Sequence, residues 1–450
     1  MRGSPPTRSR SAGLRRRRAR LVCAVGLVSV LSAACTSGGG GAADARSGDG
    51  GRTTITWQAA PFGDRTDDAR RYLVKAFERS HPDISVDVVS APTNVDTNRA
   101  GLATQIMGQA STPDVYNGDV SWAAQFASAG LALPLGEHLP RRFWDRFDPA
   151  TVRGASYKGT AYGVPLTLDQ SFLYYRKDLL AKHHLPVPVS WEQVAEQSRT
   201  LRKAGDAEYG LAWQGASYEG LTCVANEFVA AAGGSLTGEG TRGGSAQHEK
   251  QLRTALGFMD GLLDDHISPK ATTTFQEPQS LQAFTGGSAA FMRNWAYAYD
   301  TADAAGSKVR GKVGVTAMPA LKKGDGTRAS TVGGWNVYVN PHTRRQKAAL
   351  SFVSWLTGTG SQRMMAERSS TIPTVDAVRE SPRVRKLSPV LRASVGNDLV
   401  SRPTTSPYYT QISQATYSGV NSMLSGGSSP SDAAGRLAGE IDAALAGRRL

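Results

Sequence analysis

The sequence predicts an α/β protein whose exported part is divided into two domains. Near the start of that part, the spacing of apolar residues alternates between the periods of strands and helices, in the order strand, helix, strand, helix, strand. This order favours a largely parallel sheet covered by helices. The chain has 450 residues, and the roughly 400 that follow an expected export signal exceed what one core usually organises.

The first five elements are expected between residues 53 and 116. Strands are predicted at residues 53–57 and 84–89, where β-branched and aromatic residues gather. Residues 67–79 place apolar side chains on one face and therefore predict a helix. A second helix over residues 101–110 and a third strand opening at 113–116 complete the series.

More α/β elements follow a break at residues 162–165. Ser190 with Gln193 three places later forms a capping box, which predicts the start of a helix that runs to about Ala204. The remaining elements are predicted from the same periods: strands at 172–175, 313–315 and 337–339, a helix from Leu281 to Met292, and an amphipathic helix at 347–356.

The N-terminus is typical of an export signal. The first 34 residues contain eight arginines and no acidic residue, and the apolar run 21–34 is too short to span a bilayer. Small residues then precede Cys35, an arrangement that resembles the lipobox of bacterial lipoproteins. The resemblance implies a signal peptide at 1–34, lipidation of Cys35 and a Gly/Ser-rich tether at 35–52. An ordinary secretory signal is the alternative, and the export route stays open between general secretion and the twin-arginine pathway.

Charge and cysteine content restrict the function. The net charge is +14, but eight positive charges belong to the expected signal, so the rest of the chain carries only +6. Such mild basicity, spread over about 400 residues, is no nucleic-acid footprint. Cys23 lies in the signal and Cys35 is the expected lipid carrier, which leaves Cys223 alone and predicts no internal disulfide.

Metal and nucleotide motifs are missing from the sequence. Of the seven histidines only His183 and His184 are close together, and adjacent residues do not share a helix face. There is no HExxH, CxxC or Walker A motif. We therefore expect no metal site and no cofactor.

Five groups of motifs, taken in order, carry a resemblance to a known family. They are residues 114–122; 162–165 with 169 and 173–180; 213–223; 284–297; and 333–336 with Arg402, Pro403 and Tyr408. Together they resemble the family 1 extracellular solute-binding proteins of ABC importers, nearest to the trehalose/maltose-binding branch. The match of residues 213–223 suggests that branch.

The resemblance implies a two-lobed, type II periplasmic-binding-protein-like fold with hinge-crossing strands and an interlobe ligand cleft. The lobes would be 53–163 with 331–375, and 164–330 with 376–450. The implied function is capture of a sugar, such as trehalose or maltose, by hinge closure. The protein, as a monomer, would deliver the sugar to membrane permease subunits, and the missing Walker A motif implies a separate ATPase.

The site residues are also carried over by resemblance. Asp119 and Asp169 would accept sugar hydroxyls, Trp295 and Tyr297 would stack on the ring, and Arg402 would donate. The other residues implied at the cleft are Gly334, Trp335, Tyr218 and Glu219, and no choice is possible within the loop 58–64. Structural alternatives stay open, including a helix cap for Asp119, a core position for Trp335 and an ordinary ion pair for Arg402.

These residue types suit a neutral sugar. Carboxylates and amides take paired hydroxyls, aromatic rings cover the flat C–H face, and hydrogen bonds to charged groups are the stronger ones. The main rival is a secreted glycoside hydrolase, in which Asp119 and Asp169 would act as the paired carboxylates. The sequence contains no nucleophile elbow or hydrolase motif, which favours binding without chemistry.

Overall fold

The computed structural model describes residues 51–62, 68–237, 244–324 and 327–448. The expected signal peptide, Cys35 and nearly all of the expected tether lie outside these residues. Residues 47–450 form one compact unit, and the fold described below belongs to it. Within the described ranges, none of the helices combines the length and apolar character needed to cross a membrane.

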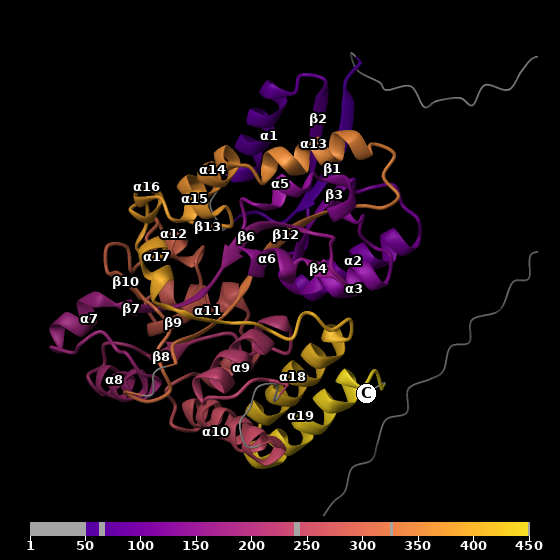
Figure 1. The fold of residues 1–450 in the computed structure, drawn as a ribbon. Helices are drawn as coiled ribbons and strands as arrows, with labels where there is room; N and C mark the ends of the chain where they lie inside the picture. Colours follow the sequence, from indigo (N-terminus) through magenta and orange to yellow (C-terminus); the bar gives the residue numbers. More distant parts are fainter. Residues whose placement is uncertain (1–50, 63–67, 238–243, 325–326, 449–450) are drawn as a thin grey trace, which may run out of the picture. The chain divides into compact units, whose positions relative to one another are not determined.

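The larger sheet has six strands in the order β13-β6-β12-β3-β1-β2 (Figure 1). They are β1 (Thr53–Ala59), β2 (Ile84–Ser90), β3 (Val115–Asp119), β6 (Val164–Asp169), β12 (Gly333–Val339) and β13 (Ile372–Pro373). β1 is parallel to β2 and β3, whereas β12 is antiparallel to β3 and β6. The expected parallel sheet is therefore confirmed only for the first three strands, because β12 returns from a later segment in the opposite direction.

The smaller sheet has four strands in the order β10-β7-β9-β8. They are β7 (Ser171–Arg176), β8 (Tyr209–Ala212), β9 (Ala289–Trp295) and β10 (Val313–Thr316). β9 runs parallel to β8 and antiparallel to β7. Two further pairs join β4 (Ser156–Tyr157) to β5 (Thr160–Ala161), and β11 (Ala329–Thr331) to β14 (Asp398–Val400).

Two groups of chain segments supply the helices near the larger sheet. The first group is α1 (Ala69–Ser80), α2 (Val95–Met107), a 3-10 turn (Val120–Trp122), α3 (Ala123–Ser128), α4 (Leu135–His138), α5 (Arg141–Trp144) and α6 (Pro149–Gly154). The second is α13 (Gln346–Leu356), α14 (Thr359–Ser369), α15 (Asp376–Arg379) and α16 (Pro382–Arg385). The next helix, α17 (Pro389–Ala393), packs on β10 of the smaller sheet. α1 packs between β2 and the pair α13 and α14, so segments far apart in sequence share one layer.

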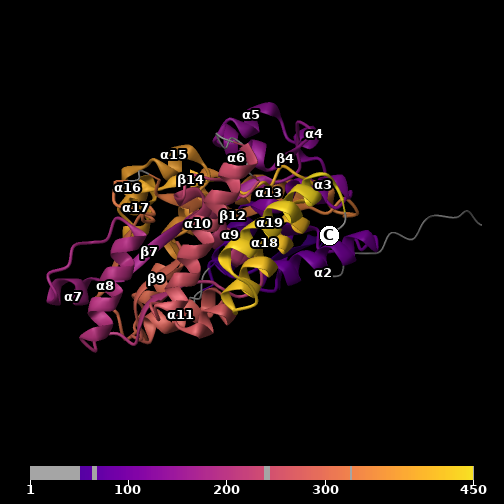
Figure 2. The ribbon, with the colours of Figure 1, turned by 90° about the horizontal axis from the view of Figure 1, so that it is seen from below.

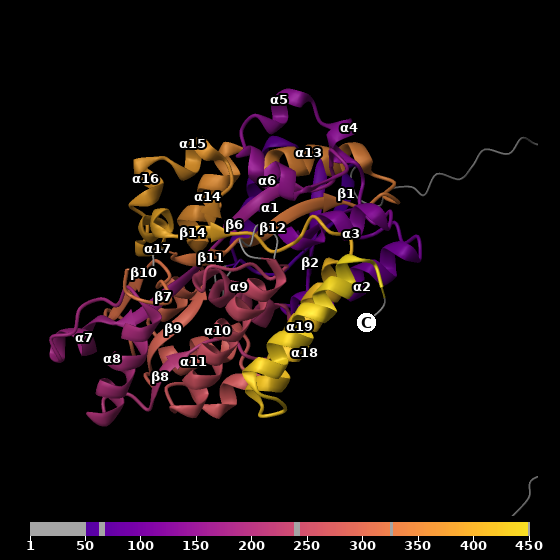
Figure 3. The same ribbon diagram turned by 60° about the horizontal axis from the view of Figure 1, so that its bottom comes forward.

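The smaller sheet has its own helices. They are α7 (Lys177–Lys182), α8 (Trp191–Lys203), α9 (Glu219–Ala231), α10 (Gly244–Asp264), α11 (Glu277–Thr285), α12 (Ala298–Ala302), α18 (Tyr409–Leu424) and α19 (Pro430–Leu445), with 3-10 turns at Lys270–Thr274 and Ser394–Gly396. Every residue of α9 is buried. It is covered by α18, α10 and β11, and α19 in turn packs on α10 and α18 (Figures 2 and 3).

Local sequence signals explain where several helices begin. Asp68 accepts a hydrogen bond from the backbone N–H of Arg70 at the start of α1. At α8 the Ser190 hydroxyl accepts from the Gln193 N–H at 3.2 Å, while the Gln193 side chain accepts from the Val189 N–H at 2.9 Å. The start of α8 predicted from its capping residues is therefore confirmed.

The helix expected from Leu281 to Met292 is wrong. The structure ends α11 at Thr285 and begins strand β9 at Ala289. Gly287 has a φ of 82°, which favours glycine and separates the two elements. The run that follows is buried on both faces of β9, and an apolar run of this kind cannot be assigned to strand or helix by period alone.

The chain crosses between the two sheets at neighbouring points. β6 and β7 are separated only by Gln170, and β11 and β12 only by Val332. The Ser171 N–H donates to the Ser330 hydroxyl at 2.9 Å, so the two crossings are held together. Sheet pairing thus places the first crossing at Gln170, after β6, whereas the sequence analysis put it at Val164. The lobe boundaries themselves stay a prediction.

Candidate functional site

A pocket of about 470 Å³ lies between elements of the two sheets. From the larger sheet it takes the ends of β3 and β6 and the start of β12; from the smaller sheet it takes the start of α9, the start of α11 and the end of β9. All nine residues carried over by resemblance line it: Asp119, Asp169, Tyr218, Glu219, Trp295, Tyr297, Gly334, Trp335 and Arg402. Positions spread over some 280 residues of sequence are thus brought to one cavity.

Arg402 joins two acidic groups that come from different sheets. Its Nη2 lies 3.0 Å from Asp119 Oδ1, at the end of β3, and its Nη1 lies 2.5 Å from Glu219 Oε1, at the start of α9. The Arg402 side chain is only 1% exposed. Its Nε is buried and has no hydrogen-bond partner among the described residues. One donor of this side chain is therefore unsatisfied within the described residues.

The pKa values of this cluster reflect burial and pairing. Burial raises the pKa of Glu219, and the positive charge of Arg402 opposes that rise. Burial acts to lower the pKa of Arg402, but Asp119 and Glu219 outweigh it and hold that pKa well above its usual range. Arg402 therefore stays charged, and Glu219 also accepts from the hydroxyls of Tyr409 and Ser413.

Asp119 has the helix-cap role that the sequence analysis left open, in addition to its place in the pocket. Its Oδ1 accepts from the Ser121 N–H at 2.9 Å and so caps the 3-10 turn after β3. The same oxygen pairs with Arg402. The side chain remains 13% exposed, and it lines the pocket. The cap and the pocket position are thus both present.

Asp169 ends β6 at the crossing between the sheets. Its Oδ1 accepts from the backbone N–H groups of Gln170 at 2.9 Å and Ala296 at 3.1 Å. Burial raises the pKa of Asp169 to about 7, although those two N–H groups and the charge of Arg293 act to lower it. The Oδ2 atom makes no hydrogen bond with a described residue, so it is available to a ligand in the pocket.

Trp295 is held from two sides. Its indole N–H donates to Glu277 Oε1 at 3.2 Å, and the Arg293 guanidinium lies 4.2 Å from its ring centroid. Glu277 also accepts from the Tyr218 hydroxyl at 2.7 Å. Glu277 thus positions two aromatic side chains of the pocket at once. The sequence analysis missed it, since an acidic residue in the first turn of a helix is ordinary.

Gly334 contributes through its backbone. Its φ is 120°, and a Cβ at this position would lie 2.1 Å from the carbonyl oxygen of Thr167. Only glycine therefore lets β12 approach β6 here, beside an irregularity in their pairing between Trp335 and Asn336. Gly333 similarly leaves room for the ring of Trp295. The two glycines bring Trp335 to the pocket while β12 stays paired.

Two other expectations had mixed outcomes. Of the loop 58–64, residues Ala60, Pro61 and Phe62 line the pocket, Gln58 bonds to Asn98 instead, and residues 63–64 lie outside the described ranges. Tyr408, which formed part of the resemblance, is 42% exposed and is not among the pocket residues. In the described ranges no three His, Cys, Asp or Glu side chains are grouped so that they could hold a metal ion.

Known proteins resemble this chain over most of its length. The family model of the bacterial extracellular solute-binding proteins matches residues 63–363. A probable ABC transporter-binding protein of Deinococcus radiodurans is 32% identical over 366 residues, which cover 79% of this chain and 86% of the relative. A mannitol-binding protein of Pseudomonas aeruginosa is 28% identical over 319 residues, 69% of this chain and 70% of the relative. The solved structure of maltose-bound MalE3 of T. maritima has a TM-score of 0.79 and 29% identity, and it covers 87% of this chain and 99% of its own.

Proposed function

The chain belongs to the bacterial extracellular solute-binding protein family, and from this membership we infer the specific role of its pocket. At the family level it is the solute-binding component of an ABC sugar transporter and acts outside the cytoplasm. We propose that its ligand is a sugar, specifically a disaccharide such as maltose or trehalose. The sugar would bind in the pocket that contains Trp295, Asp119 and Asp169.

The composition of the pocket is the observation that carries the proposal. An indole ring, held between a guanidinium behind it and a carboxylate at its N–H, offers one rigid flat face to the C–H side of a pyranose. Asp169 Oδ2 and the pocket side of Asp119 offer acceptors for hydroxyls, and Arg402 adds a charged donor side chain to the lining. Charged groups make the stronger hydrogen bonds, which offsets the loss of the sugar's hydration.

The size of the pocket and one relative support a disaccharide. A volume of about 470 Å³ falls within the usual range for a small-molecule site, about 300–1,000 Å³. The solved structure named above carries maltose, whereas the mannitol-binding relative takes a linear polyol. Tyr218, Trp295, Tyr297 and Trp335 provide more aromatic surface than a single ring would use, which favours two sugar units.

The proposed motion is closure of two lobes about the crossing strands. The pocket takes residues from both sheets, and the crossings at Gln170 and Val332 are short and adjacent. Glu227 accepts from the Ser171 hydroxyl at 2.6 Å and from the Thr331 N–H at 3.2 Å, so one side chain supports both crossings. A few residues at element ends that absorb the change in backbone angles are what a hinge requires.

The rest of the transport role follows as part of the same proposal. The protein would be held at the outer face of the membrane by a lipid on Cys35 and would act as a monomer. It would deliver its sugar to permease subunits driven by a separate ATPase. No chemical step on the sugar is proposed, since the relatives named above are binding proteins.

A sugar panel tests the proposal. The exported chain is screened by thermal shift against maltose, trehalose, mannitol and glucose, and each hit is measured by calorimetry and analysed for breakdown. A ligand at 100 times its dissociation constant adds about 2.7 kcal/mol to the free energy of unfolding, which is easily detected. We expect a disaccharide to give the largest shift and to be recovered intact. Breakdown of the sugar at enzymatic rates would favour the hydrolase instead, and a larger shift with mannitol would refute the disaccharide.

A further inference from the structure

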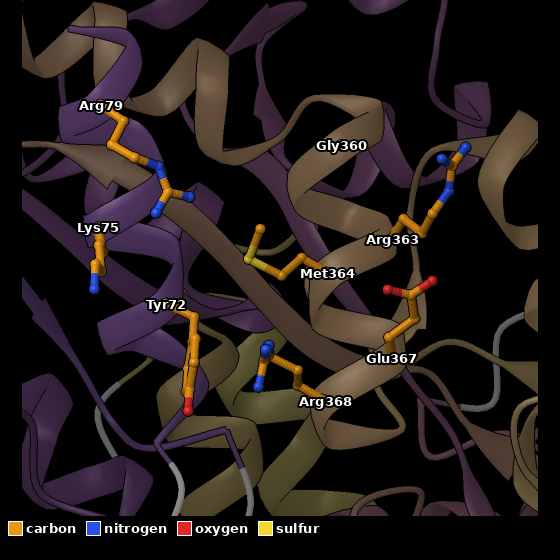
Figure 4. A pocket seen from close by; sticks show the side chains of 8 residues that line it. All are labelled: Tyr72, Lys75, Arg79, Gly360, Arg363, Met364, Glu367 and Arg368. Carbon is orange, nitrogen blue, oxygen red and sulfur yellow. The ribbon is translucent and has the colours of Figure 1, made fainter.

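A second cavity, on the outer surface of the larger-sheet part, is rich in positive charge. It is a groove of about 280 Å³ between α1 and α14, lined by Tyr72, Lys75, Arg79, Gly360, Arg363, Met364, Glu367 and Arg368. Four of these side chains are basic and one is acidic, and Figure 4 shows Arg79 and Arg368 directed into the space between the helices. None of these residues lines the sugar pocket.

The acidic member does not neutralise the groove. Glu367 Oε1 lies 3.1 Å from a guanidinium nitrogen of Arg383, on α16, so its charge is shared with a fifth basic residue. The Arg368 guanidinium carbon lies over the Tyr72 ring, 3.6 Å from its centroid. Lys75 and Arg79 form no ion pair with any residue that the structure describes, and both are exposed. Lys75 and Arg79 therefore give the groove two exposed positive charges that can pair with an external anion.

The position of the groove indicates which anion it meets. Arg79 belongs to the last turn of α1, beside Glu78. Glu78 lies 3.9 Å from Arg52, the residue just before β1. The open end of the groove thus adjoins the point where the chain enters the folded unit. In the sequence, residues 36–51 separate that point from Cys35, the proposed lipid carrier.

We propose that the groove between α1 and α14 binds the headgroups of anionic phospholipids. This rests on the proposed attachment of the chain to the membrane through Cys35. The Lys75 ammonium and the Arg79 guanidinium pair with lipid phosphate. Tyr72, 38% exposed, and Met364 supply an apolar border for the glycerol part of the lipid. The contact orients the larger-sheet part toward the membrane surface and leaves the sugar pocket unobstructed.

A vesicle-binding experiment with a matched control tests this proposal. The exported chain carries Cys35→Ser so that no lipid anchor contributes, and it is sedimented with phosphatidylglycerol-containing or pure phosphatidylcholine vesicles. The variant Lys75→Gln/Arg79→Gln removes two charges one helical turn apart from the groove. The control Arg199→Gln/Lys203→Gln removes the same two charge types, also one turn apart, from exposed positions on α8.

We expect binding to the anionic vesicles alone, weakened by salt. The groove variant should bind about 25-fold more weakly, about fivefold for each charge removed, and the control should change far less. Equal losses in both variants would show general basicity, and no binding to anionic vesicles, or equal binding to neutral ones, would also overturn the proposal. So would groove mutations that impair association with the permease but leave vesicle binding intact, because the partner would then be an acidic protein.

The experiment separates this proposal from the proposed function. Both variants should keep the sugar affinity of the parent protein, because the mutated residues are outside the sugar pocket. Vesicle binding without sugar binding would refute the function and leave the groove assignment standing. Sugar binding without vesicle binding would refute the groove assignment and leave the proposed function standing.

Discussion

Sugar affinity should rise with pH through about 7, because Asp169 must be ionised to bind hydroxyls well. Burial raises the pKa of this carboxyl to about 7, and its Oδ1 is already occupied by two backbone N–H groups. Only Oδ2 is left for the ligand, and an ionised Oδ2 accepts hydroxyl hydrogens more strongly than a protonated one. The neighbouring charges are Arg293, which favours ionisation, and Glu277, which opposes it.

The magnitude follows from the fraction of protein in the competent state. With a pKa of about 7, roughly 1% of Asp169 is ionised at pH 5, so the dissociation constant should increase by at most about 100-fold between pH 8 and pH 5. Below pH 7 sugar binding should release a proton. The stability of the sugar-free protein should change in the opposite direction. The pKa of Asp169 in the folded protein lies above its unfolded value of 3.8. The free energy of unfolding therefore falls as pH rises from about 4 to about 7.

Calorimetry at a series of pH values, in buffers of different ionisation enthalpy, measures both the affinity and the proton release. Asp169→Asn is the control, since an amide of the same shape cannot ionise. We expect this variant to bind more weakly at pH 8 and to lose the pH dependence. An affinity that is constant between pH 5 and 8 in the parent protein, or an unchanged pH dependence in Asp169→Asn, would refute the reasoning.

Three further changes test other parts of the site. Trp295→Ala should cost at least about 2 kcal/mol of sugar-binding free energy, measured by calorimetry, with little change in melting temperature. The control Trp144→Ala lies outside the pocket and should leave the affinity intact. Equal affinities in the parent protein and both variants would remove the stacking role of Trp295. Arg402→Met should lower the free energy of urea unfolding by about 3–5 kcal/mol, because the buried Glu219 and the half-buried Asp119 lose their partner. The double variant Arg402→Met/Glu219→Gln should recover part of this loss, and a single variant with unchanged stability would contradict the pairing. Gly334→Ala should lower the free energy of urea unfolding by about 1–3 kcal/mol, since the new Cβ would overlap the Thr167 carbonyl. Unchanged stability would show that β12 can shift to make room.

Local signals in the sequence predicted the first part of the fold well. The strands at 53–57 and 84–89, the helix at 67–79 and the strand opening at 113 are all present, with ends shifted by a few residues, because each has a clear period and a recognisable boundary. The direction of β12 could not be predicted in this way. It depends on pairing with β3 and β6, which are remote in sequence, and no local period encodes such a partner.

The site was predicted by resemblance rather than by local physics. Asp119, Trp295 and Arg402 are ordinary residue types in their own segments, and only the matched motifs pointed to a shared cavity that the structure then shows. Glu277 was missed because its role appears only when Trp295 and Tyr218 are placed beside it. Their roles toward a ligand stay predictions, to be decided by the variants above.

A crystal structure of the exported chain with the disaccharide that gives the largest thermal shift is the most direct test of the account. One pyranose should lie flat on the indole of Trp295, with its hydroxyls bonded to Asp169 Oδ2 and to the Asp119–Arg402 pair, and the sugar should be intact. A sugar bound outside this cavity, or held without contact to Trp295 and either aspartate, would contradict it.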